Sequence, residues 1–66
     1  MTLEQIKAAV NAGKKVFWAS SLYEVRKDSN GSFNIVCTSN NNAIGLTWTD
    51  GVTLNGEPEQ FFEEIN

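Results

Sequence analysis

The sequence predicts a small α+β domain, in which one N-terminal helix packs on an antiparallel β-meander of four or five strands. Two observations support this prediction. Apolar residues recur at helical spacing near the start of the chain, and after Gly13 the apolar pattern changes to a period of two. Short segments rich in glycine, asparagine and serine separate the alternating stretches, so tight turns should join consecutive strands.

The chain has 66 residues, which is enough for one small domain, so residues 1–66 are treated as a single unit. Hydrophobic residues make up 41% and charged residues 20%, a balance that favours a globular chain over a disordered one. No apolar run approaches the roughly 20 residues that a membrane helix needs, and the start shows no signal-peptide pattern. With one cysteine and no histidine, the sequence excludes an internal disulfide, a structural zinc cluster and a Ser-His-Asp triad.

The first element is predicted to be a helix over residues 3–12. Thr2 is a suitable N-cap, and Gln5 three residues later completes a capping box. Gly13 lies where a left-handed C-cap is expected. One apolar stripe at helical spacing consists of Leu3, Ile6 and Val10.

The alternating part of the chain predicts strands near residues 15–19, 22–27, 33–38, 43–48 and 52–54. Their register should place apolar residues on one face of the sheet. Across the first turn, Ser20-Ser21, this criterion pairs Val16 with Val25 and Trp18 with Tyr23. Across a three-residue loop that ends at Gly31, preferred here to a two-residue Asn-Gly turn, it pairs Val25 with Ile35 and Tyr23 with Cys37.

Across the two later turns the expected pairs are Cys37 with Ile44, Ile35 with Leu46, Phe33 with Trp48, Trp48 with Val52, and Leu46 with Leu54. The predicted buried face then consists of Val16, Trp18, Tyr23, Val25, Phe33, Ile35, Cys37, Ile44, Leu46, Trp48, Val52 and Leu54. A face this apolar needs a cover, which the helix stripe supplies. An SH3-like half-barrel remains open as a curled variant of the same meander.

The C-terminal segment is predicted to form a short helical turn. Pro58 suits the first position of such a turn. Phe61 and Ile65 are four residues apart, so one face of a helix would carry both. The turn is therefore expected to place Phe61, Phe62 or both on the sheet edge.

The opposite face of the predicted sheet carries three large apolar residues, Phe17, Leu22 and Val36, which the pairing brings close together. Glu24 and Arg26 lie on the same face. Three interpretations stay open: a contact patch for a partner or a second copy, scattered apolar surface residues, or apolar residues that the C-terminal segment covers. Under the first interpretation, these five residues form the predicted partner-binding site.

No group of residues predicts catalysis. Ser20-Ser21 has no base available other than lysine, and Cys37 alternates with core residues, so it is interpreted as a buried small apolar side chain. A solvated face is expected for the acidic residues Glu57, Glu59, Glu63 and Glu64. The chain is therefore not expected to be an enzyme or to bind a cofactor or metal.

The net charge makes nucleic acid an unfavoured partner. Five basic and eight acidic residues give a net charge of −3, and phosphates repel an acidic chain. All the basic residues lie within residues 1–33, however, and the edge that they could form consists of Lys14, Lys15, Arg26 and Lys27. A small nucleic-acid-binding or DNA-associated module that uses this basic edge is the alternative function.

Three segments of the second half carry a resemblance: Ile44-Gly45-Leu46-Thr47-Trp48, Asp50-Gly51 and Leu54-Asn55-Gly56. They look like segments of small uncharacterised proteins of bacteriophages and prophages, and the helix end at Ala12-Gly13-Lys14 is similar to them as well. The resemblance implies a bacterial cytoplasm and action on a host or phage protein, and it assigns no site residue.

Together these features predict a non-catalytic protein-interaction module, such as a phage accessory protein that modulates a bacterial host protein in the cytoplasm. The expected partner is a protein, while nucleic acid is disfavoured and no membrane partner is expected. A core this small is compatible with a monomer or a weak homodimer.

Overall fold

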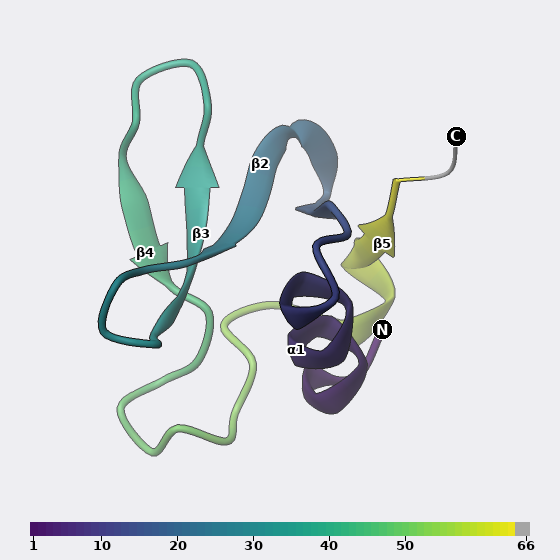
Figure 1. Ribbon diagram of the computed structural model, residues 1–66, viewed down its shortest axis with the longest axis vertical. Coiled ribbons are helices and arrows are strands. Elements are labelled where there is room, and N and C mark those ends of the chain that lie inside the picture. Colours follow the sequence, from purple (N-terminus) through teal and green to yellow (C-terminus); the bar gives the residue numbers. More distant parts are fainter. Residues whose placement is uncertain (65–66) are drawn as a thin grey trace.

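A computed structural model describes residues 1–64 and confirms the α+β class (Figure 1). The elements in chain order are helix α1 (Leu3–Asn11), strands β1 (Val16–Trp18), β2 (Ser20–Lys27), β3 (Phe33–Cys37) and β4 (Ala43–Gly45), the 3-10 helix η1 (Pro58–Gln60) and strand β5 (Phe61–Glu63). The strands form one antiparallel sheet in the order β4-β3-β2-β1-β5. The first four strands make a meander, and the C-terminal segment returns to the free edge of β1.

Helix α1 has the predicted capping box. The Gln5 backbone N–H donates to Thr2 Oγ1 (3.2 Å), and the Thr2 N–H donates back to Gln5 Oε1 (2.9 Å). The helix ends one residue earlier than predicted, with Ala12 as its C-cap, and Gly13 follows at φ +82°. Two otherwise unsatisfied donors at the helix start are therefore paired locally.

The core lies between α1 and one face of the sheet, the inner face. Its buried residues are Ile6, Ala9, Val16, Val25, Ile35, Leu46 and Phe61. Three of them, Val16, Val25 and Ile35, lie directly opposite one another on neighbouring strands. Leu3 and Val10 of the predicted helix stripe are half-buried against this cluster. The alternating pattern thus orients the sheet as the sequence predicts.

The first turn differs from its prediction. Val16 does pair with Val25, but the chain reverses at Ala19 (φ +64°) rather than at Ser20-Ser21, and Trp18 lies opposite Ser20. The register shifts after Phe17. A bulge in β2 takes up the residues between Ser20 and Glu24, which have no partner in β1. The Trp18 and Tyr23 rings still meet edge to face, with centroids 5.3 Å apart.

Strands β2 and β3 have the predicted register, with Val25 opposite Ile35 and Tyr23 opposite Cys37. The register between β3 and β4 differs from its prediction by two residues, because Ile44 lies opposite Ile35 rather than Cys37. The cause is a tighter turn than predicted: Cys37 N–H already donates to Asn42 O (2.7 Å), and Asn41 adopts φ +60°. The prediction that Ile44 is buried is therefore wrong, since Ile44 is 50% exposed at the end of the row.

The predicted strand 52–54 is reduced to one isolated bridge, between Thr47 and Leu54. This pairing is one residue out of the predicted register, and a one-residue slip turns side chains to the other face. Trp48 and Val52 were predicted to be buried, and this is wrong: they are 64% and 71% exposed. Leu54 keeps a half-buried position against the core.

The C-terminal segment supplies the fifth strand of the sheet. The predicted helical turn is present as η1, but the chain then extends into β5, which pairs with β1. Phe61 is buried in the core, and Phe62 points to the opposite face. Ile65, expected to share a helix face with Phe61, lies outside the described residues.

Gly56 is the glycine with the least space for a side chain. A Cβ there would lie 2.6 Å from Trp18 Nε1, and its φ of +152° already disfavours other residues. Gly51 is the matched control, since its φ is +75° and no atom lies within 4 Å of its Cβ position. We expect Gly56→Ala to lower the free energy of unfolding by about 1–3 kcal/mol more than Gly51→Ala does. Urea denaturation measures this difference, and equal losses in the two variants would contradict the close approach.

Candidate functional site

The outer face, defined here as the sheet face opposite α1, carries a continuous row of side chains across all five strands. From β5 to β4 the row consists of Phe62, Phe17, Glu24, Val36 and Ala43. None of these side chains is buried among the described residues. The sheet therefore presents an accessible surface with aromatic residues at one end.

The apolar part of the outer face centres on the neighbouring strands β1 and β5. The rings of Phe17 and Phe62 meet at a tilt of 41°, with centroids 5.6 Å apart. Leu22 lies on the same face of β2, where its carbonyl accepts hydrogen bonds from the backbone and hydroxyl of Thr38 (2.8 and 2.9 Å). Leu22 and Phe62 are each 41% exposed, so this surface is open to a partner.

An ion pair lies in the middle of the outer face. Arg26 Nε donates to Glu24 Oε1 at 2.7 Å, and both residues come from the same face of β2. The Glu24 side chain is only 15% exposed, because Phe17 and Val36 lie opposite it on the flanking strands. The pair gives the apolar face a polar centre in which the two charges offset each other.

All five predicted partner-binding residues, Phe17, Leu22, Val36, Glu24 and Arg26, lie on the outer face. Sequence reasoning missed Phe62 as a sixth member. The signal was the Phe61-Phe62 pair itself, because adjacent residues of an extended strand point to opposite faces.

Three of the four residues of the predicted basic edge, Lys14, Arg26 and Lys27, have partners within the chain. Lys14 Nζ lies 3.3 Å from Glu63 Oε1, and Arg26 is paired with Glu24. Lys27 Nζ donates to Asn11 Oδ1 (3.1 Å) and lies 5.7 Å from the centre of the Phe33 ring. Neighbouring carboxylates therefore offset part of the positive charge that a phosphate backbone would require.

Cys37 is half-buried rather than buried, because the Asn-rich turn beside it is open to solvent. Its Sγ lies 3.3 Å from Ser39 Oγ. Hydrogen bonds from the Ser39 side chain and backbone lower the pKa of the thiol. Between residues 1 and 64, no group of three or more His, Cys, Asp or Glu side chains is placed to hold a metal ion.

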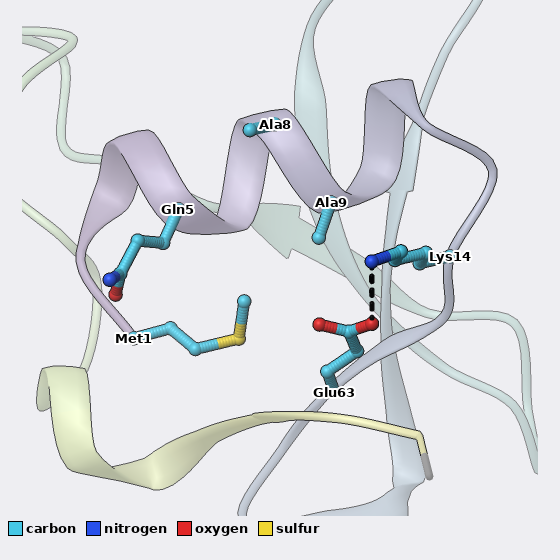
Figure 2. A pocket seen from close by; sticks show the side chains of 6 residues that line it. All are labelled: Met1, Gln5, Ala8, Ala9, Lys14 and Glu63. Atoms are coloured by element: carbon cyan, nitrogen blue, oxygen red, sulfur yellow. Dashed lines mark ion pairs between the residues drawn. The ribbon is translucent and has the colours of Figure 1, made fainter. Parts of the chain in front are cut away.

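A groove between α1 and β5 is lined by Met1, Gln5, Ala8, Ala9, Lys14 and Glu63 (Figure 2). The Met1 side chain lies along it between the helix and the strand, and the Lys14–Glu63 ion pair closes one end. A smaller concavity of about 240 Å³ lies on the inner face, and its lining includes Trp18, Tyr23, Cys37 and Ile44.

Comparison with protein-family models, with curated proteins and with solved structures yields no match to this chain. No helix within residues 1–64 has the length and apolar character needed to cross a membrane.

The side-chain carboxylate of Asp50 holds the tip of the hairpin formed by residues 48–53 through hydrogen bonds. Asp50 Oδ1 accepts from the N–H groups of Val52 and Thr53 (both 2.9 Å), and Asp50 Oδ2 accepts from Thr53 Oγ1 (2.6 Å). The Thr53 hydroxyl, followed by these backbone donors, holds the pKa of Asp50 below its usual value of 3.8.

A carboxyl with a depressed pKa contributes stability that is fully present above the unfolded pKa and is lost as the pH falls through the folded pKa. Asp50 should therefore contribute to acid sensitivity below about pH 3.8. We expect Asp50→Asn to reduce the loss of unfolding free energy between pH 6 and pH 2, measured by urea denaturation. Glu59→Gln, at an exposed carboxylate, is the control. An unchanged pH profile in Asp50→Asn would contradict this role.

Proposed function

We propose that this chain is a non-catalytic protein-interaction module that binds its partner through the outer face. The observation that supports the proposal is the open apolar row across the sheet, with Phe17 and Phe62 in ring contact and Leu22 exposed nearby. Phenylalanine and arginine are enriched at protein interfaces, and lysine and glutamate are depleted at their centres. The outer face fits this composition apart from the paired Glu24.

The arrangement suits a protein partner with a complementary apolar surface. Binding would remove Leu22 and Phe62 from water, and each buried square ångström of apolar surface contributes about 25 cal/mol before the costs of association. Glu24 and Arg26 would enter the interface already paired, so neither charge would be left alone on desolvation. The ion pair would then set orientation, while the apolar residues supply affinity.

The resemblance to small phage and prophage proteins extends the proposal to a bacterial host protein as the partner and to the bacterial cytoplasm as the compartment. The same resemblance supports an accessory role, in which binding modulates the host protein. Both the proposed compartment and the proposed accessory role depend on which protein binds the outer face.

The test begins with a tagged chain in bacterial lysate treated with nuclease, and mass spectrometry identifies the retained protein. Calorimetry with that purified protein then compares the wild type with Leu22→Ser and Phe62→Ser, which remove two partly exposed apolar side chains of the outer face. We expect each variant to weaken binding by at least about tenfold, as truncation of an interface anchor does.

Val52→Ser is the matched control, because Val52 is an exposed apolar residue of the separate 48–53 hairpin. It should bind like the wild type, and circular dichroism should show all variants folded. Equal affinity of the wild type, Leu22→Ser and Phe62→Ser would exclude the outer face as the binding surface. Retention that disappears on nuclease treatment would instead favour the nucleic-acid alternative.

A further inference from the structure

The two edges of the sheet differ in how their backbone groups are satisfied. At the β5 edge, the Phe61 N–H donates to Pro58 O within the η1 turn. The Met1 amino group donates to Pro58 O (2.6 Å) and approaches Phe61 O at 3.5 Å. Some of the backbone N–H and C=O groups of β5 that face away from β1 thus already have hydrogen-bond partners. An incoming strand would have to displace Met1.

The β4 edge is open. Asn42 O accepts from Cys37 N–H, Leu46 N–H donates to Phe33 O, and Ile44 lies opposite Ile35. Because inward and outward groups alternate along an antiparallel strand, Ala43 and Gly45 direct their backbone N–H and C=O groups away from β3. Among the described residues, this outward side has one hydrogen bond, from Asn55 Nδ2 to Gly45 O (3.3 Å). Figure 1 shows β4 at the border of the sheet.

The β4 strand has no charged side chain and no proline to block edge pairing, although it is only three residues long. Its residues Ala43, Ile44 and Gly45 are all exposed. The Ile44 side chain is 50% exposed and lines the inner-face concavity together with Trp18 and Tyr23. An added strand would therefore gain both backbone hydrogen bonds and an apolar contact.

We propose that β4 pairs with β4 of a second copy of this chain, in an antiparallel arrangement about a twofold axis at Ile44. In this register Ala43 of each copy exchanges backbone hydrogen bonds with Gly45 of the other. The two Ile44 residues lie opposite each other as a non-hydrogen-bonded pair, the arrangement in which side chains come closest. The result is one continuous sheet across both copies.

Three features favour a second copy as the occupant. The outward backbone groups of Ala43 and Gly45 flank Ile44 on either side, so the same segment can pair with them when it runs in the opposite direction. Gly45 O would then accept a second hydrogen bond beside the one from Asn55 Nδ2. The pairing brings the two inner-face concavities together and covers Ile44 in both copies. The contact is also isologous, and because the other edge is partly occupied by Met1, assembly should stop at a dimer rather than continue as a fibre.

Sedimentation equilibrium tests the dimer at concentrations from about 10 µM to about 1 mM, the range of weak association. The mass of the wild type should rise from 7.3 kDa towards twice that value. Ile44→Lys places like charges opposite each other at the axis and should keep the chain monomeric at about tenfold higher concentration. Leu22→Lys, a matched change on the outer face, should dimerise like the wild type.

Amide hydrogen exchange of the wild type provides a readout that needs no variant. The Ala43 and Gly45 amides should exchange fast in dilute protein and become protected as the dimer forms. Three results would each overturn the proposal: a monomer throughout the concentration range, a dimer that Leu22→Lys breaks and Ile44→Lys does not, or a dimer in which these two amides stay unprotected. If Ile44→Lys does not fold, the exchange measurement alone decides.

Discussion

The structure depends on the burial of one cross-strand row against one helix. Val16, Val25 and Ile35 lie opposite one another, and Ile6 and Ala9 of α1 cover them. Because strand side chains alternate between faces, burying this row fixes which residues point the other way. The outer face is therefore a consequence of the core: no register that keeps the buried row could move Phe17 or Val36 to the helix side.

The C-terminal strand completes this small core and also gives the sheet its asymmetry. Phe61 adds a large buried side chain to a domain whose size limits how much surface it can bury. Pairing of β5 with β1 leaves β4 as the open edge, while the Met1 amino group approaches the backbone of the other edge at Phe61 O. The same short segment brings Phe62 beside Phe17 on the outer face. One strand thus contributes to stability, to the candidate site and to the difference between the two edges.

The parts that could be predicted from sequence are those where one register alone keeps the apolar residues together. The short loop ending at Gly31 leaves one such choice, and Val25 accordingly lies opposite Ile35. The Asn-rich turn is different, because a shift of two residues keeps every side chain on its face and pattern alone cannot detect it. Strand β5 has three residues, too few to show a period, so the Phe61-Phe62 pair alone could not show which of its two rings lies on the outer face.

Strand pairing through β4 would change what the outer face can do. A twofold axis at Ile44 in an antiparallel pair runs perpendicular to the sheet, so it leaves both outer faces on the same side of the dimer. Two copies of Phe17 and Phe62 would then face one partner from one continuous sheet. A partner with two matching sites could engage both, and the second contact would form at a high effective concentration without any new residue. Modest affinity at each outer face would then be enough for stable binding, which suits a face whose apolar residues are few and half-exposed.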